Sequence, residues 1–403
     1  MMPTSHQNMR LTSTIAAAES VLDQAVAQGD LRLGLAMIAS SEGILFQHAV
    51  GARDVEGQSP VDIDAIIAMA SMTKLVTTVA ALQLVEGGAL SLDEPVNHYL
   101  PALERVQILV EFRGDEPVYK PAPRAPTARE LITHTSGFVY PMWNATALKA
   151  QTLGLTAGLA AGRASTNAPL SFAPGSRMEY GISTDWLGIL VEQISGQTLL
   201  SYFQQHIFTP LKMVDTSYFL PLAKADRAVP IVLRTPDGLI ESPIFQPKPS
   251  DETAEYFYSG GGGLYSTLSD YTRLLRALLR GGELEGQRIL QTATVNSMFA
   301  NQIGSLSVQT GTSVMPMLSN DFDMGFGSSA KWGLGFLLHT EGTAQGRNPG
   351  SGSWGGLFNS YFWIDPAQDL CGIFATQLLP FFDAQAVATL KALERIAYGQ
   401  SEA

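Results

Sequence analysis

A serine and a lysine three residues apart are the residues in this sequence best placed for covalent chemistry. Ser71 and Lys74 form an S-x-x-K pattern that opens an apolar stretch continuing to Glu86. On a helix, positions i and i+3 share one face, so the two side chains would lie side by side. Serine is a weak nucleophile until a base takes its proton, and lysine can be that base when burial lowers its pKa. The pattern predicts a nucleophile and its base.

A structural interpretation of the same stretch stays open. Ser71 could be an ordinary helix N-cap, because a serine hydroxyl satisfies free backbone N–H groups in the first turn. The spacing also occurs a second time, at Ser328 and Lys331. That copy lies in a glycine-rich loop that leads into a strand. It therefore lacks the helix start that favours negative charge on a serine oxygen.

Two further segments carry groups that could complete such a site. Tyr180 follows a Pro-Gly turn and precedes a helix, so its hydroxyl could relay a proton in a cleft. The alternative is a core tyrosine with one hydrogen bond. Residues 350–357, with the sequence Gly-Ser-Gly-Ser-Trp-Gly-Gly-Leu, could bring backbone close to a substrate and supply an N–H to an oxyanion hole. The alternative there is the bulged start of a strand.

The composition narrows the classes of function. The chain has 403 residues, of which 45% are hydrophobic and 15% charged, so it can bury a large core. Its 25 basic and 37 acidic residues give a net charge of -12, which argues against a nucleic-acid-binding surface. The single cysteine, Cys371, allows no intrachain disulfide and no thiolate zinc cluster. The six histidines show no helical metal spacing, so we expect neither metal nor cofactor.

The sequence also carries an expectation about location and partners. No apolar run reaches the length of about 20 residues that a membrane span needs. Residues 1–21 lack the apolar core of a secretory signal. We expect a cytoplasmic protein whose partner is a small molecule, with neither a membrane nor a nucleic acid as partner. The oligomeric state stays unknown at this stage.

The elements that must position these residues come from both ends of the chain. Alternating or continuous apolar runs predict strands at 33–39, 44–50, 331–339, 356–364 and 370–377. Helical periodicity predicts helices at 15–27, 71–86 and 384–398. Gly87 and Gly88 would end the second of these helices.

The middle of the chain has a different character. Residues 95–250 are rich in loops and prolines, with helices expected at 185–194 and 199–206. Strands near both ends, interrupted by a mostly helical middle, predict an α/β (α+β) fold with one antiparallel sheet flanked by helices. We expect a discontinuous α/β domain of residues 9–95 and 251–403, and an inserted helical domain of residues 96–250. The active site would lie in the cleft between them.

The order of these motifs resembles a known group. A helix-opening S-x-x-K, a mid-chain tyrosine motif and a late glycine-rich strand are similar to the serine β-lactamase and penicillin-binding-protein superfamily, in particular its class C-related branch. Stretches at 130–137, 207–213 and 261–270 extend the resemblance over most of the chain. It implies a β-lactamase-like fold. It also implies Ser71 as nucleophile, Lys74 as its base partner, and Tyr180 as the group that assists deprotonation and protonates the leaving alkoxide.

Two departures from the class C pattern change the substrate that the resemblance implies. Those enzymes carry Lys-Thr-Gly, whose lysine helps to hold a substrate carboxylate, where this chain has the W-G-G that begins at Trp354. Their Y-x-N motif is Y-G-I here, so the amide that would contact a β-lactam side chain is missing. Both changes favour uncharged, apolar acyl substrates. W-G-G at this position resembles the family VIII carboxylesterases and a related fungal acyltransferase that loads a statin side chain.

The resulting expectation is a serine carboxylesterase that hydrolyses small uncharged esters through an acyl-enzyme. The absence of G-x-S-x-G argues against an ordinary α/β-hydrolase. A β-lactamase or D-alanyl peptidase, an acyltransferase using the same acyl-enzyme, and a non-catalytic ligand-binding relative stay as alternatives. The resemblance implies an oxyanion hole made by the backbone N–H groups of Ser71 and Leu357.

Several residues are expected around this centre. The substrate-binding candidates are Trp354, Gly355, Gly356, Tyr140 and Trp143. For Tyr140 and Trp143, the alternative is packing inside the helical domain. His134 sits in a turn after a short helix, and we expect it to be structural.

Overall fold

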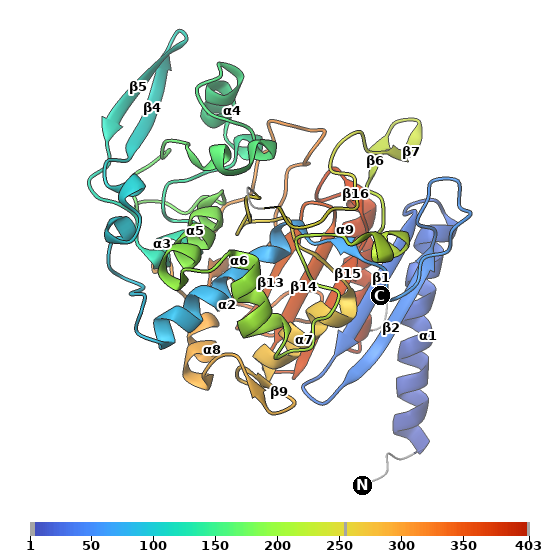
Figure 1. Ribbon diagram of the computed structural model, residues 1–403. Helices are drawn as coiled ribbons and strands as arrows, with labels where there is room; N and C mark the ends of the chain where they lie inside the picture. Colours follow the sequence, from blue (N-terminus) through green and yellow to red (C-terminus); the bar gives the residue numbers. More distant parts are fainter. Residues whose placement is uncertain (1–4, 254–255, 401–403) are drawn as a thin grey trace.

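A seven-stranded antiparallel sheet forms the centre of the protein, and both ends of the chain contribute to it. The computed structural model describes residues 5–253 and 256–400 (Figure 1). The sheet has the order β11-β12-β13-β14-β15-β1-β2. Its strands are β11 (Ala330–Trp332), β12 (Leu337–His339), β13 (Ser351–Gly356), β14 (Ser360–Asp365), β15 (Leu370–Ala375), β1 (Leu33–Ala39) and β2 (Ile44–Gly51).

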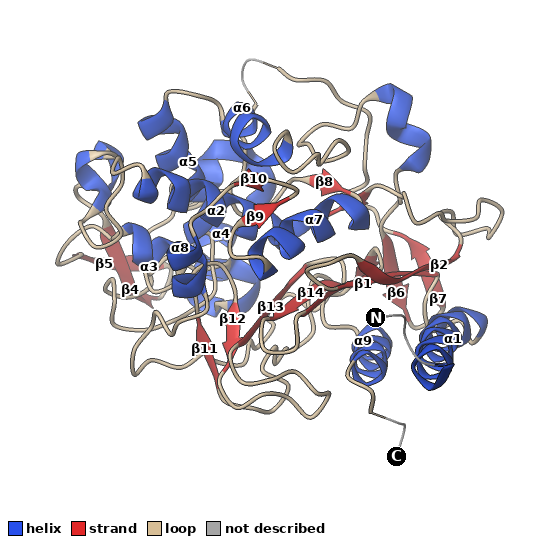
Figure 2. Cartoon of the chain, turned by 90° about the horizontal axis from the view of Figure 1, so that it is seen from below, coloured by secondary structure: helices blue, strands red, loops and turns tan. Residues whose placement is uncertain are grey.

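Helices cover both faces of this sheet. α1 and α9 lie on one face, and α2 and α7 lie on the other (Figure 2). The helices are α1 (Ser5–Ala27), α2 (Thr73–Glu86), α3 (Ala128–Ile132), α4 (Ala145–Thr152), α5 (Ser183–Ser195), α6 (Leu199–Phe203), α7 (Leu268–Leu279), α8 (Thr292–Met298) and α9 (Ala384–Ala397). Shorter helical turns are η1 (Ala70–Met72), η2 (Val96–His98), η3 (Pro101–Leu103), η4 (Pro141–Trp143), η5 (Leu159–Thr166), η6 (Gln204–Phe208) and η7 (Leu222–Arg227).

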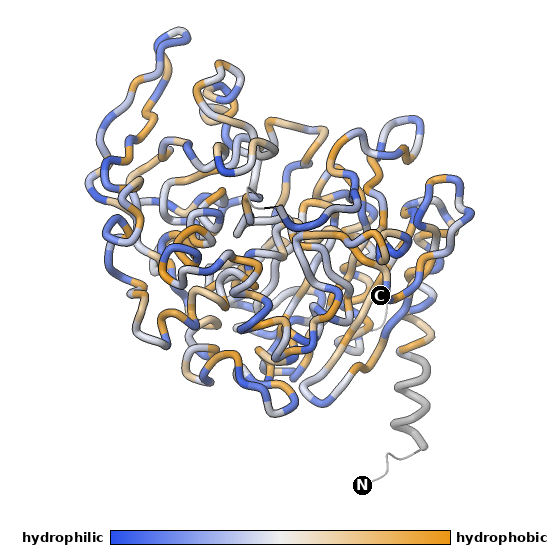
Figure 3. The backbone as a smooth tube through the Cα atoms, viewed as in Figure 1, coloured by the Kyte–Doolittle hydropathy of each residue, from blue (hydrophilic) through white to orange (hydrophobic). Residues whose placement is uncertain are grey.

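Small sheets decorate this framework. They comprise β3 (Ile67–Ala68) with β8 (Tyr265–Ser266), β4 (Gln107–Arg113) with β5 (Glu116–Pro121), β9 (Glu283–Leu284) with β10 (Gln287–Arg288), and β6 (Val232–Thr235) between β7 (Gly238–Glu241) and β16 (Leu378–Leu379). The β4-β5 and β6-β7 hairpins project from the body, and their tips are hydrophilic (Figure 3). The pairing of β6 with β16 joins the middle of the chain to its C-terminal part.

The expected α/β fold with one sheet built from both chain ends is confirmed. Two strand predictions were wrong in detail. The run 331–339 is two strands, β11 and β12, because a turn with Gly335 at φ 101° reverses the chain. The run 356–364 joins the end of β13 to β14 across a three-residue turn. The domain boundaries at 96 and 250 stay a prediction.

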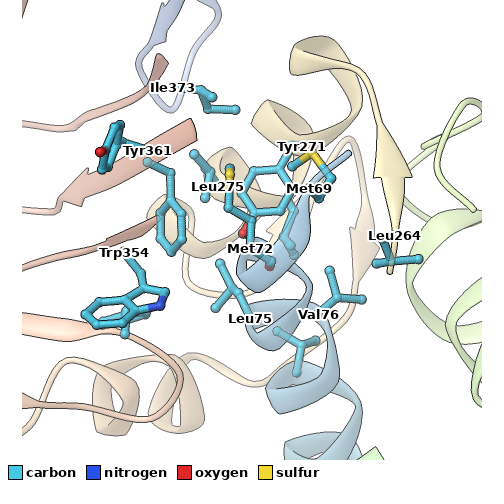
Figure 4. Close-up of a cluster of buried hydrophobic side chains, with 14 of the residues drawn as sticks. Met69, Met72, Leu75, Val76, Leu264, Tyr271, Leu275, Trp354, Tyr361 and Ile373 are labelled. Carbon is cyan, nitrogen blue, oxygen red and sulfur yellow. The ribbon is translucent and has the colours of Figure 1, made fainter. Parts of the chain in front are cut away.

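Helix α2 is the element that carries the site into the core. Its residues from Thr73 to Leu82 are all buried, so it is a core helix, and the polar side chains among them, Lys74 included, are hydrogen-bonded inside the protein. Met72, Leu75 and Val76 pack among side chains from the sheet and from α7, including Trp354 (Figure 4). Close packing of this kind resists displacement. The packing of α2 in the core therefore holds the start of this helix in a fixed position.

Candidate active site

Ser71 lies in the η1 turn directly before α2. The preceding residue, Ala70, has φ 43°, in the left-handed region that non-glycine residues rarely adopt. Neither η1 nor α2 has a side-chain N-cap hydrogen bond, so the interpretation of Ser71 as an N-cap is wrong. Its Oγ instead accepts a hydrogen bond from Lys74 Nζ at 3.1 Å. The strained backbone of Ala70 helps to turn the Ser71 side chain towards a cavity, and Ser71 lines that cavity.

The Lys74 amine is buried and has a complete set of acceptors. Besides Ser71 Oγ, its Nζ donates to Tyr140 Oη at 3.0 Å and to the carbonyl oxygen of Gly261 at 2.7 Å. An ammonium group has three protons and no acceptor capacity, so three acceptors satisfy it fully. The side chain is only 2% exposed, and water contributes little to its solvation. This geometry fits the charged form of the lysine.

The direction of the Lys74 pKa agrees with that geometry. Burial, the largest single influence, lowers the pKa, as expected from the sequence. The negative charge that Tyr140, Tyr180 and Asp185 carry when ionised outweighs it, and the net pKa of Lys74 is raised. Burial raises the pKa of Tyr140, with Lys74 acting in the opposite direction. Burial thus keeps the phenol of Tyr140 protonated at neutral pH, and Lys74 titrates together with the acidic groups around it.

Tyr180 lies beside Tyr140, with the two ring centres 5.5 Å apart, and it is hydrogen-bonded to Trp354. The Trp354 indole Nε1 donates to Tyr180 Oη at 3.1 Å. Lys74 Nζ lies 4.9 Å from the centre of the Tyr180 ring and 5.2 Å from the centre of the Tyr140 ring. The amine thus lies close to two neighbouring phenol rings. Sequence reasoning expected Tyr140 only as a wall residue, because no motif distinguished its hydroxyl.

His134 positions the segment that carries Tyr180. It is buried, and its Nδ1 accepts a hydrogen bond from the backbone N–H of Gly181 at 3.3 Å. Its ring lies 4.5 Å from that of Tyr180, centre to centre. A side chain at Gly181 would place Cβ 2.1 Å from the carbonyl oxygen of Phe138, so only glycine fits there. The structure places His134 behind the tyrosine, as a supporting residue.

Asp185 supports Lys74 through the glycine-rich loop 260–263. Its Oδ1 accepts hydrogen bonds from Ser259 Oγ at 2.5 Å and from the N–H of Gly261 at 3.0 Å. The carbonyl of that same Gly261 accepts from Lys74. Burial raises the pKa of Asp185, and the charge of Lys74 opposes the shift. Sequence reasoning missed this residue; its place in the first turn of the helix after Tyr180 was the available signal.

Ser71, Tyr140, Tyr180 and Asp185 line a cavity of about 770 Å³. The expected residues that line it are Ser71, Tyr140, Trp143, Tyr180, Trp354, Gly355 and Leu357. Gly356 is not part of the lining. A Cβ there would lie 2.5 Å from the carbonyl oxygen of Met69, so this glycine lets β13 approach the segment before Ser71. Among the described residues of the lining, Arg163 is the only lysine or arginine.

Three other features were sought in residues 5–253 and 256–400: a metal site, a membrane-spanning helix and a reactive thiol. Within that part of the chain, no group of three or more His, Cys, Asp or Glu side chains could hold a metal ion. None of the helices described there combines the length and apolarity needed to cross a membrane. Cys371 is fully buried in β15, and burial raises the pKa of its thiol to about 12. Such a thiol is inert.

Comparison with known proteins places this arrangement in a family. A family model described as beta-lactamase matches residues 18–395. The chain belongs to the beta-lactamase family. It is 32% identical over 337 residues to the acyltransferase calJ of Penicillium decumbens, covering 81% of this chain and 78% of that protein. It is 30% identical over 385 residues to the lovastatin esterase of Penicillium rubens, covering 93% and 95%.

The fold comparison agrees with this beta-lactamase-family assignment. The solved structure of a simvastatin synthase mutant from Aspergillus terreus matches with a TM-score of 0.80 at 27% identity, covering 96% of this chain and 98% of that one. The protein is a serine hydrolase of this family, and the resemblance inferred from its motifs is confirmed.

The buried, neutral His134 predicts a pH dependence of stability. Burial, assisted by the charge of Lys74, lowers its pKa well below 6.5 in the folded protein. The unfolded chain therefore binds the proton first as the pH falls below about 6.5. The free energy of unfolding should then fall by up to about 1.4 kcal/mol per pH unit from this residue. Urea unfolding of wild type and His134→Gln between pH 5 and 8 measures the difference in slope.

The exposed His98 supplies the control for this experiment. His98→Gln should leave the slope below pH 6.5 as in wild type, whereas His134→Gln should reduce it. The slope that remains includes the contribution of His339, whose pKa burial also lowers. At pH 8 the slopes of all three proteins should agree. Identical slopes for His134→Gln and wild type at acidic pH would mean that His134 titrates normally in the folded state.

Proposed function

We propose that this protein is a serine carboxylesterase that hydrolyses small, uncharged carboxylic esters through an acyl-enzyme intermediate. The observation that carries this proposal is the hydrogen bond of 3.1 Å between Ser71 and Lys74, beside a cavity that Ser71 and several aromatic side chains line. Trp354 stands in that cavity where class C enzymes carry a cationic lysine. Relatives named lovastatin esterase and, in Burkholderia gladioli, esterase EstB support an ester as the substrate.

The first half of the reaction transfers the acyl group to the enzyme. A bond forms between Ser71 Oγ and the carbonyl carbon, and the bond from that carbon to the alcohol oxygen breaks. The serine proton passes through the unit of Lys74 and its tyrosines to the departing alkoxide. Because these groups are coupled, they titrate as a unit. Tyr180 is the proposed donor to the alkoxide.

The second half returns the enzyme to its resting state. Water attacks the acyl carbon, the bond to Ser71 Oγ breaks, and one water proton returns to that oxygen through the same unit. Negative charge on the carbonyl oxygen would be stabilised by the backbone N–H groups of Ser71 and Leu357. The close approach of β13 to Met69, at Gly356, supports a short distance between these two segments.

The β-lactamase alternative has weaker support. A β-lactam carries a carboxylate, and Trp354 offers it an indole rather than a cation. The indole N–H is also occupied, since it donates to Tyr180. Arg163 lines the cavity from an exposed segment, where solvent screens its charge.

Removing the Ser71 hydroxyl should abolish esterase activity. We expect Ser71→Ala to lower kcat/KM for p-nitrophenyl acetate and butyrate by at least about a thousandfold, because no acyl-enzyme can form. The second S-x-x-K copy provides a matched control. Ser328→Ala removes a hydroxyl that bonds only the carbonyl of Gly325 among the described residues, and it should retain full activity. Equal rates for Ser71→Ala and wild type would refute the proposal.

The two tyrosines should contribute differently. Tyr180→Phe should lower kcat for p-nitrophenyl butyrate about a hundredfold or more, because the proton donor to the alkoxide is lost. Tyr140→Phe leaves one proton of Lys74 without an acceptor, so it should shift the acidic or basic limb of the pH–rate profile with a smaller loss of kcat. Profiles from pH 5 to 10 test this. The reverse order of effects would assign the donor role to Tyr140.

Acyl transfer to an alcohol is the second candidate function. The similarity to the acyltransferase calJ favours it, and the same acyl-enzyme serves both reactions. The choice depends on how well the site excludes water. With p-nitrophenyl butyrate as donor and added 1-propanol, we expect propyl butyrate to increase with alcohol concentration in gas chromatography. If butyrate is the sole product at every alcohol concentration, the enzyme catalyses hydrolysis and not acyl transfer.

A further inference from the structure

A second cavity of about 400 Å³ adjoins the active-site cavity. The two cavities share four aromatic residues in their linings, and we call this set the aromatic wall. It consists of Trp143, Tyr180, Phe322 and Trp354. Ser71 lines only the first cavity among these described linings. The acyl group bound to Ser71 would therefore lie on one side of the wall.

The residues of the aromatic wall form the shared border of the two cavities, and their side chains are well supported. Ring centres lie 5.0 Å apart for Trp143 and Phe322, 5.7 Å for Trp143 and Tyr180, and 4.7 Å for Tyr180 and Trp354. The Phe322 ring lies directly against the backbone of Gly311, where a Cβ would be 1.9 Å from Cε1 of the ring. Trp143 Nε1 is fixed by a hydrogen bond of 2.9 Å to Ser319 Oγ.

The remainder of the second cavity is mixed: Ala145, Met178 and Val308 are apolar, and most of the other side chains are polar. Three of its hydroxyl groups form no hydrogen bond within the described part of the chain; they belong to Thr146, Thr310 and Thr312. The charged groups neutralise one another, because Arg177 pairs with Glu179 at 2.6 Å. Glu179 also accepts from the amide of Asn144 at 2.7 Å. Free hydroxyls without net charge suit a neutral ligand that carries hydroxyl groups of its own.

Tyr180 connects this second cavity to the chemistry. In the proposed mechanism its hydroxyl gives a proton to the oxygen of the departing alcohol. The alcohol portion must therefore leave Tyr180 at hydrogen-bonding distance. Tyr180 borders both cavities, so the space beyond it, lined by the threonines, is available to that alcohol.

We propose that the second cavity binds the alcohol portion of the ester, and that it selects a neutral, hydroxylated alcohol such as a polyol. The acyl portion would occupy the first cavity. This inference rests on the proposed esterase function. The step is the one described above: the carbon–oxygen bond to the alcohol breaks, and the alkoxide takes the proton that Ser71 released. The alcohol then departs through the second cavity, which Arg177 and Glu179 border at partly exposed positions.

The test compares three butyrate esters that share one acyl group. The alcohol portion of methyl butyrate is too small to reach the second cavity. Butyl butyrate has a larger apolar alcohol portion, and 2,3-dihydroxypropyl butyrate has a larger alcohol portion with two hydroxyl groups. Thr310→Trp places an indole in the second cavity from an exposed loop position. Ser307→Trp is the matched control, because Ser307 lies on the same loop, is exposed, and is absent from the described linings of both cavities.

The expected result is specific to the alcohol. Thr310→Trp should lower kcat/KM for the dihydroxypropyl and butyl esters at least fivefold, and it should change the value for methyl butyrate by less than twofold. Ser307→Trp should change none of the three. Thr310→Val and Thr312→Val together should lower kcat/KM at least threefold for the dihydroxypropyl ester alone. Equal losses for all three esters in Thr310→Trp, or no loss for any, would overturn the proposal.

A binding measurement separates this proposal from the esterase proposal. Saturation-transfer NMR of Ser71→Ala with 2,3-dihydroxypropyl butyrate reports contact of the protein with the glyceryl protons without turnover. Adding Thr310→Trp should remove that contact and keep the contact with the butyryl protons. Wild type without any esterase activity would refute the esterase function, while this NMR result would still decide the binding role of the cavity. Unchanged glyceryl contacts in the double variant would overturn it.

Discussion

The structure of the site depends on one buried ammonium group. Lys74 brings together Ser71 on its own helical segment, Tyr140 from the middle of the chain, and Gly261 from the loop before α7. Each hydrogen bond to a charged donor contributes about 1.5–3 kcal/mol, and a buried charge without partners would be far more costly. The lysine therefore fixes the relative positions of the groups that the reaction needs. Asp185 extends this network by holding the loop that supplies the third acceptor.

The sequence predicted the elements whose patterns are local. The strands at 33–39 and 44–50 and the helix at 384–398 were correct almost to the residue, because each has clear periodicity and turn residues at its ends. The hairpin β11-β12 was not predicted, since its alternation continues through the turn at Gly335. Gly356 shows a similar limit, because a glycine that permits close backbone approach resembles one that lines a cavity.

The sequence predicted those residues of the site that belong to short motifs, and it did not predict those that depend on contacts between distant segments. The i, i+3 spacing predicted Ser71 beside Lys74, and the structure places them at hydrogen-bonding distance across the junction of η1 and α2. The order of the motifs led to Tyr180, whereas the hydroxyl of Tyr140 and the carboxylate of Asp185 depend on contacts between distant segments. The pKa of Lys74 also depends on contacts between distant segments. Burial alone was expected to lower its pKa, but three acidic groups from elsewhere in the chain reverse the direction.

The central sheet couples the two ends of the chain across nearly its whole length. Strand β1 lies between β2 and β15, with Leu35 opposite Ala375. During synthesis, Ser71 leaves the ribosome long before β13, β14 and β15 exist. Non-local pairings of this kind form late and slowly in folding. The growing polypeptide thus carries the Ser71 hydroxyl without the aromatic wall, the proposed oxyanion segment or the surrounding core, and competence for catalysis arises only after β13, β14 and β15 have been made and have paired.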